Sequence, residues 1–179
     1  MNLEVVGIII THTHFDHIVG LGDLTKSYPE ATVYVTLDDL PGLFSPVLNL
    51  SEMFDTSVGS YVCEQPKKMK ALFYDNDYDL DGIKFRVLPE RGHSKGSVML
   101  DFYEDEIIFI GEILQGDRAD RVVPNLSDTL NIIEDNIRMI FKNYKSSYRV
   151  FPSHFEVDFS LGDIIKYNIR VQRILAMKN

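Results

Sequence analysis

The most constraining feature of this sequence is a cluster of histidines that directly follows an apolar run. The apolar run 5–10 is continuous and largely β-branched, which predicts a fully buried strand over residues 4–10. His12, His14, Asp16 and His17 come next, so three of the five histidines lie in one short stretch. Side chains alternate along extended backbone, so His12 and His14 can leave the strand end on the same side. Neutral imidazole is the commonest transition-metal ligand, and the stretch therefore predicts a metal site.

Two simpler interpretations compete with a metal site here. One is a chance cluster of surface histidines, and the other is the remnant of an affinity tag. A tag would be an uninterrupted histidine run without a carboxylate and without a preceding strand. Asp16 and His17 belong to the turn after His14, where they can face a second ion.

The other candidate ligands also follow predicted strands. His93 lies in the glycine-flanked turn 92–97 after the alternating strand 83–88, and Glu112 and His154 follow the strands 106–111 and 148–151. Side chains at the ends of rigid strands suit a preorganised site. Taken singly, His93 also fits an ordinary turn, His154 a strand end and Glu112 a surface charge.

The order of these residues resembles the metallo-β-lactamase-fold hydrolases. The resemblance is carried by His12-x-His14-x-Asp16-His17, by Gly92-His93-Ser94-Lys95-Gly96-Ser97, by Gly111-Glu112 and by Ser153-His154. Every histidine of the chain falls on a family ligand position, in the family's order. Weaker matches at Asn49-Leu50-Ser51 and Asn168 point toward the hydroxyacylglutathione hydrolase (glyoxalase II-like) branch.

The resemblance implies an α/β fold, the αββα sandwich, with residues 1–179 as a single domain. It implies one metal ion held by His12, His14 and His93, a second held by Asp16, His17 and His154, and Glu112 at the position of a bridging carboxylate. The expected ions are zinc, with iron or manganese as alternatives. Two such ions roughly 3.5–4 Å apart activate water for attack on a carbonyl or phosphoryl centre. The expected activity is hydrolysis of a small thioester, ester or lactone, with Asp16 in a catalytic role.

The chain departs from the family at three points. Glu112 replaces an aspartate, so its carboxylate reaches one methylene further in a type of site where ligand distances are tightly fixed. Lys95 replaces the usual proline of the turn. Few residues precede His12, whereas the family has several strands there, so we expect an N-terminally truncated form of the fold. A second copy is expected to cover the missing strands in a homo-oligomer.

The composition limits the kinds of binding partner that the protein is expected to have. The net charge of −9 argues against nucleic-acid binding and leaves a small-molecule substrate as the expected partner. No apolar run approaches the roughly 18 residues of a membrane span. Cys63 is the single cysteine, which excludes an internal disulfide, and we expect it to be a passive side chain in a cytoplasmic protein.

Several other residues have a functional and a simpler interpretation. Arg91, Lys95 and Arg118 are candidates for binding an anionic substrate, although a solvated role is simpler. Tyr61, Tyr74 and Tyr78 are expected to pack rather than to donate to an oxyanion. Hydrophobic periodicity predicts helices over 16–27, from an N-cap at Ser127 to residue 144, and over 161–177, with a strand over 32–36. Residues 37–66 are irregular and are expected to form a loop or lid over the site.

Three alternative functions remain open at this point. A phosphodiesterase or nuclease could use the same metal centre. A metal-binding protein without turnover is suggested by Glu112 and by the short N-terminus. A redox di-iron protein is compatible with histidine and carboxylate ligands.

Overall fold

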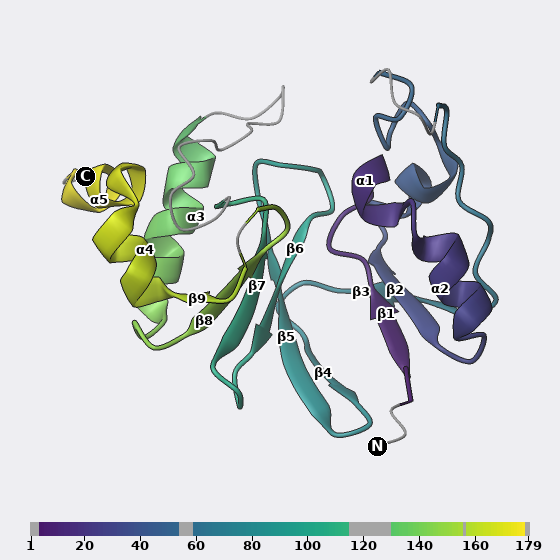
Figure 1. Ribbon diagram of the computed structural model, residues 1–179, viewed down its shortest axis with the longest axis horizontal. Coiled ribbons are helices and arrows are strands. Elements are labelled where there is room, and N and C mark those ends of the chain that lie inside the picture. The colour runs from purple at the N-terminus through teal and green to yellow at the C-terminus, as the bar shows by residue number, and fades with distance from the viewer. Residues whose placement is uncertain (1–3, 54–58, 115–129, 156, 178–179) are drawn as a thin grey trace. The chain divides into compact units, whose positions relative to one another are not determined.

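The computed structural model describes residues 4–53, 59–114, 130–155 and 157–177 (Figure 1). The chain consists of two compact units, one formed by residues 1–73 and 79–82 and the other by residues 74–78 and 83–179. Each unit is built on a β-sheet with helices packed against it. That the two units form a single domain stays a prediction.

The first unit contains a parallel three-stranded sheet in the order β1 (Gly7–Ile9), β2 (Thr32–Thr36), β3 (Met69–Leu72). Two short helices, α1 (Phe15–Ile18) and α2 (Leu21–Ser27), connect β1 to β2. The 3₁₀ helix η1 (Leu40–Phe44) follows β2. Parallel neighbours need such a crossover, and the apolar run before His12 therefore becomes the first strand of a β–α–β unit.

The core of the first unit joins the sheet to these helices. Its buried members are Ile10, Ile18, Leu21, Val33, Val35, Leu43 and Cys63. The predicted helix 16–27 is two short helices, with Val19 as the C-cap of α1 and Gly20 as the N-cap of α2. The chain therefore turns directly after α1, which holds two of the candidate ligands.

The second unit is built on a six-stranded sheet in the order β4-β5-β6-β7-β8-β9, of which residues 79–80 at the end of β4 are counted with the first unit. The strands are β4 (Asp77–Leu80), β5 (Ile83–Pro89), β6 (Val98–Phe102), β7 (Ile107–Gly111), β8 (Arg149–Pro152) and β9 (Phe159–Ser160). The pairs β5–β6 and β6–β7 are antiparallel, β7–β8 is parallel and β8–β9 is antiparallel. The predicted hairpin over 97–111 is thus present as β6 and β7.

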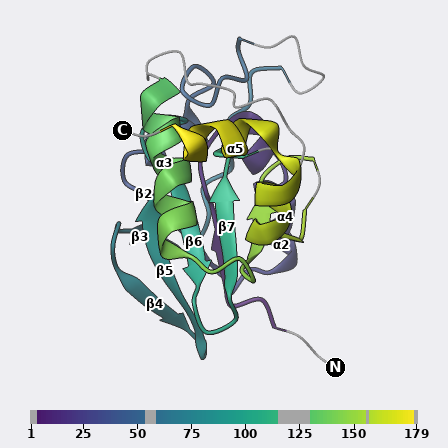
Figure 2. The ribbon, with the colours of Figure 1, turned by 90° about the vertical axis from the view of Figure 1, so that its left-hand side faces the viewer.

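Three helices cover one face of this sheet: α3 (Leu130–Asn143), α4 (Leu161–Tyr167) and α5 (Ile169–Ala176) (Figure 2). Ile133, Ile137 and Ile140 of α3 pack on the strand residues Ile108 and Val150. The apolar stripe predicted for this helix is therefore core. Its predicted N-cap, Ser127, and also Arg118 lie outside the described residues.

The predicted C-terminal helix 161–177 is interrupted at Asn168. The side chain of Asn168 is buried and accepts a hydrogen bond from the Val171 N–H at 3.0 Å, so it caps a new helix, α5. No helix within the described residues combines the length and apolar character that crossing a membrane requires.

Candidate metal centre

The seven candidate ligands divide between the two units. His12, His14, Asp16 and His17 belong to the first unit, and His93, Glu112 and His154 belong to the second. Five of them lie shortly after strands, and Asp16 and His17 lie in α1, the helix that follows β1. The strand ends predicted to carry the ligands are therefore present in both units.

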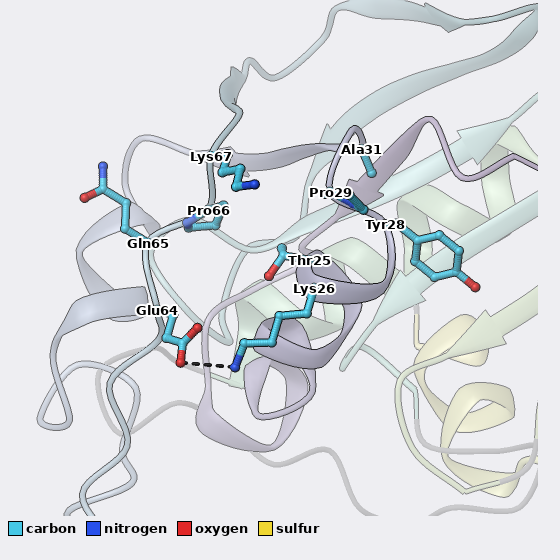
Figure 3. A pocket seen from close by; sticks show the side chains of 9 residues that line it. All are labelled: Thr25, Lys26, Tyr28, Pro29, Ala31, Glu64, Gln65, Pro66 and Lys67. Atoms are coloured by element: carbon cyan, nitrogen blue, oxygen red, sulfur yellow. Dashed lines mark hydrogen bonds and ion pairs between the residues drawn. The ribbon is translucent and has the colours of Figure 1, made fainter.

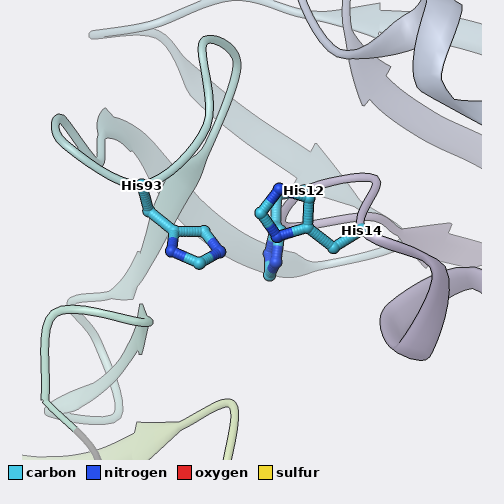
Figure 4. Close-up of side chains that lie close together, drawn as sticks. All are labelled: His12, His14 and His93. Carbon is cyan, nitrogen blue, oxygen red and sulfur yellow. The ribbon is translucent and has the colours of Figure 1, made fainter. Parts of the chain in front are cut away.

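The first-unit ligands are in mutual contact. The rings of His12 and His14 meet edge to face with centroids 4.8 Å apart, and the His12 and His17 centroids are 4.1 Å apart. The Nε2 of His17 lies 3.4 Å from a carboxylate oxygen of Asp16. Ligand atoms of His12 lie within 4.8 Å of ligand atoms of both His14 and His17. Figure 4 shows His12 and His14 on the segment after β1, and His93 on the turn after β5.

Local backbone geometry explains this cluster. His14 has extended backbone dihedrals and is the N-cap of α1, and His12 lies two positions before it. Asp16 then falls in the first turn of α1, where a helix favours negative charge. His17 comes one residue later, and its ring turns back onto His12.

The electrostatics of the first-unit set fit a divalent cation. His12 is fully buried, and burial lowers the pKa of His14 below its ordinary 6.5, against the opposing effect of Asp39 and Asp16. A lowered pKa keeps the imidazole neutral at neutral pH, and neutral imidazole is the form that binds metal. Clustered imidazole and carboxylate donors suit zinc, iron or manganese.

In the second unit, Glu112 and His154 lie at the ends of adjacent strands. Glu112 follows β7 and His154 follows β8, which is parallel to β7. The Ser153 N–H donates to the carbonyl oxygen of Gly111 at 2.9 Å, so the pairing continues to the candidate ligands. The Nε2 of His154 and a carboxylate oxygen of Glu112 are 3.2 Å apart, and Glu112 is only 3 % exposed.

A second buried carboxylate holds the turn at Glu112. Oε1 of Glu90, which is 2 % exposed, accepts a hydrogen bond from the Glu112 N–H at 2.8 Å. Gly111 has a positive φ of 57°, and a Cβ added there would lie 1.9 Å from Oε2 of Glu90. Glycine is therefore required at position 111 both by the backbone and by the space that Glu90 fills.

The turn that carries His93 is held in place by contacts with α3 and by a hydrogen bond within the turn. Gly92 has a φ of 102° and packs against Ile133 of α3. The side-chain amide of Asn136, also in α3, donates to the Arg91 carbonyl at 2.5 Å. The Ser94 N–H donates to the hydroxyl of Ser97 at 3.1 Å, which closes the turn. Lys95 replaces proline in an exposed part of this turn and leaves these bonds in place.

The other residues singled out from the sequence differ in their exposure and in the groups that they contact. Arg91 and Lys95 are exposed. The Tyr61 hydroxyl donates to the Ile18 carbonyl at 3.1 Å, and burial raises the pKa of Tyr61 to about 12, so this donor stays protonated. Cys63 is buried, and burial raises the pKa of its thiol, which disfavours the reactive thiolate.

A separate pocket of the first unit contains no candidate ligand. It lies between α2 and the segment 64–67, and Lys26 and Glu64 form an ion pair across it at 3.2 Å (Figure 3). Both partners of this pair are exposed, as is usual for a surface ion pair of little energetic weight.

Sequence reasoning missed two buried carboxylates near the ligands, Glu90 and Asp39. Each directly or closely follows a strand, Glu90 after β5 and Asp39 after β2. An acidic residue at the end of a buried strand was the available signal. Their hydrogen-bond partners, Glu112 and Thr13, are 22 and 26 residues away in the chain.

Comparisons with known proteins bear on the family to which this chain belongs. The sequence model of the metallo-beta-lactamase superfamily matches residues 1–154, a range that contains all seven candidate ligands. A probable metallo-hydrolase of Streptococcus pyogenes serotype M6 is 32 % identical over 152 residues, which cover 83 % of this chain and 63 % of the relative. A hydroxyacylglutathione hydrolase of Francisella tularensis subsp. novicida is 26 % identical over 162 residues, 90 % of this chain and 53 % of the relative.

Solved structures share the fold. The B3 metallo-beta-lactamase BLEG-1 superposes with a TM-score of 0.78 at 21 % identity, over 93 % of this chain and 77 % of that one. TTHA1623, crystallised in a di-iron-bound form, gives a TM-score of 0.71 at 22 % identity, over 92 % and 77 % of the two chains. The predicted α/β fold is thereby confirmed.

The chain spans between about half and two thirds of the length of these two curated relatives, 53 % and 63 %. The family match nevertheless covers most of the length of this chain, residues 1–154, and extends to the last candidate ligand, His154. The chain therefore belongs to the metallo-beta-lactamase superfamily.

Proposed function

We propose that this protein is a metal-dependent hydrolase that acts on a small thioester, ester or lactone. The observation that carries the proposal is the contact among His12, His14, Asp16 and His17 at one strand end of a chain that belongs to this superfamily. The pairing of Glu112 with His154 in the second unit supports it.

We assign the ligands as the family resemblance implies. His12, His14 and His93 would hold one divalent ion, and Asp16, His17 and His154 would hold another. Glu112 would supply a further carboxylate ligand at this centre. Bound there, the ions would supply Lewis-acid polarisation of the substrate and an activated water. Zinc is the first candidate, and iron is supported by the di-iron form of one fold neighbour.

The chain's own residues set the conditions for this chemistry. Burial lowers the pKa of His14, which favours the neutral imidazole that can bind a metal ion. The side chain of Asp16 is 41 % exposed, whereas that of Glu112 is 3 % exposed. We therefore propose that Asp16 is the carboxylate nearest to incoming substrate. Glu90 fixes the backbone of Glu112 by accepting its N–H, which limits how far the longer side chain of glutamate can shift its carboxylate.

The substrate class is taken from the relatives. Several curated relatives at 26 % identity are hydroxyacylglutathione hydrolases, which suggests thioesters as the first substrates to test. Lactones and simple esters place the same kind of carbonyl at the metal centre. A phosphodiester is the competing substrate for the same ions.

The test combines metal analysis with a substrate panel. Protein purified without chelator is analysed by inductively coupled plasma mass spectrometry and assayed on a hydroxyacyl thioester, a lactone and a nitrophenyl phosphodiester. We expect about two equivalents of metal per chain and turnover of the thioester or the lactone. His14→Ala and Asp16→Ala should lose metal and turnover, whereas Asp135→Ala, which removes an exposed aspartate from α3, should keep both.

The other outcomes contradict the proposal in different ways. Protein that neither contains nor takes up metal would remove the metal centre. Bound metal without turnover of any of the three substrates would favour a metal-binding protein that is not an enzyme. Turnover of the phosphodiester alone would make the protein a phosphodiesterase.

A further inference from the structure

The backbone of the His12–Val19 segment is tied at three points to residues that follow β2. These supporting residues are Asp39, Asn49 and Tyr61, and all belong to the first unit. The region 37–66 was expected to be a loop or lid over the site. In its described part it consists of η1, turns and irregular segments, and it is hydrogen-bonded to the segment that carries the histidines.

Asp39 is joined to Thr13 by two hydrogen bonds. It is 6 % exposed, and its Oδ2 accepts a hydrogen bond from the Thr13 N–H at 2.9 Å. The Thr13 hydroxyl donates to the Asp39 carbonyl at 3.0 Å. A Cβ added to Gly42 would lie 2.1 Å from that hydroxyl, so Thr13 is enclosed on this side as well. Thr13 stands between His12 and His14, and fixing it fixes the direction in which both imidazoles leave the backbone.

Asn49 and Tyr61 hold the helix that follows. The Phe15 N–H, at the first position of α1, donates to the Asn49 carbonyl at 2.9 Å. Asn49 is fully buried, and its side-chain amide donates to the carbonyls of Gly42 and Tyr61 at 3.1 and 2.9 Å. The Tyr61 hydroxyl donates to the Ile18 carbonyl at the other end of α1. Both ends of α1 are therefore attached to the same supporting residues.

We propose that Asp39 is a positioning residue for the metal centre, acting through Thr13 to orient His12 and His14. The inference rests on the proposed function, because it assigns Asp39 a role toward metal ligands. Metal ligands need partners that lock their geometry, since ligand distances are fixed within a few tenths of an ångström. A buried carboxylate that accepts the backbone N–H between two ligands meets that need without touching the metal.

The experiment measures cobalt binding by optical titration, because the absorption bands of Co²⁺ report coordination geometry. The variants are Asp39→Ala, which removes the acceptor, and Asp39→Asn, which keeps an oxygen acceptor but no charge. Asp101→Ala is the matched control, since Asp101 is also a buried aspartate (8 % exposed) and lies in the second unit. We expect D39A to bind Co²⁺ about 10–100-fold more weakly and with altered bands. D39N should recover most of the affinity, and D101A should match the wild type.

Hydrogen exchange of the Thr13 amide in metal-free protein gives a readout that needs no metal. The amide should exchange slowly in the wild type and in D39N, and fast in D39A. If circular dichroism shows D39A to be unfolded, Asp39→Ser replaces it, because serine is too short to reach the Thr13 N–H and is tolerated before a helix.

The outcomes separate this inference from the proposed function. Equal affinity and equal bands in the wild type and a folded D39A would overturn the role of Asp39. A loss in D101A as large as that in D39A would also overturn it, because the effect would then be general destabilisation. A wild type that binds no Co²⁺ or Zn²⁺ would overturn the proposed function, and with it the role of Asp39 toward metal.

Discussion

Replacing Gly111 by alanine is expected to destabilise the second unit by about 2–5 kcal/mol, the sum of two contributions. The first is the backbone, because Gly111 has a φ of 57°, and an L-residue in the left-handed region costs about 1–2 kcal/mol. The second is a steric clash, because the new Cβ would lie 1.9 Å from Oε2 of Glu90.

The collision cannot be relieved by a small movement. Glu90 is 2 % exposed, so its carboxylate has no route to water, and moving it breaks the 2.8 Å bond from the Glu112 N–H. A buried N–H left without its acceptor costs about 1–3 kcal/mol. Both contributions act on the turn that carries Glu112, so we also expect G111A to bind less metal than the wild type.

Urea unfolding followed by circular dichroism measures the change in free energy, with metal-free protein used throughout. Gly22→Ala is the matched control, because Gly22 lies within α2 and no atom comes within 4 Å of an added Cβ. G22A should gain about 0.5–1 kcal/mol. A G111A variant within about 0.5 kcal/mol of the wild type would refute the argument from Glu90.

Three further predictions use other parts of the chain. Burial raises the pKa of Asp101 above 3.8, so its contribution to stability is present at acid pH and is lost as pH rises through the raised pKa. In urea titrations Asp101→Asn should therefore gain stability relative to the wild type from about pH 4 upward, and a difference independent of pH would contradict this. Ser160→Ala removes the N-cap of α4, whose hydroxyl accepts from the Asp163 N–H at 3.0 Å, and should cost about 1 kcal/mol in the same assay; an unchanged midpoint would show that the capping box contributes nothing. Removing metal with a chelator should lower the free energy of unfolding by about 2.7 kcal/mol for each ion that had been present at 100 times its Kd, and overlapping unfolding curves would argue against bound metal.

Secondary structure could be predicted best for segments in which apolar residues are contiguous or alternate with polar ones. The strand 32–36 and the hairpin 97–111 were predicted because their apolar residues are contiguous or alternate, and the structure has β2 in one place and β6 and β7 in the other. The strands β3 and β4 were not predicted, because each is four residues long and mixes apolar with charged side chains. Helix length was overestimated at Gly20 and Asn168, since hydrophobic period alone does not mark an internal cap.

The candidate ligands could be found from sequence because histidines are few and lie at strand ends. Their assignment as ligands stays a prediction. The residues that hold them in place were harder to find, since Glu90 and Asp39 act on backbone groups far away in the chain. Nothing in the local sequence around an acidic residue shows which distant N–H it will accept, and this pairing is a property of the folded chain.

The parallel pairing of β7 and β8 has a consequence for how this chain can vary. The distance between Glu112 and His154 is set by the ladder, through bonds such as that from the Ser153 N–H to the Gly111 carbonyl. The distance does not depend directly on the length of the connection between β7 and β8. Insertions and deletions between β7 and β8 are thus expected to leave this distance unchanged as long as α3, which lies in that connection, keeps its place in the core. A one-residue slip in β8 is different, because it would turn His154 to the opposite face of the sheet.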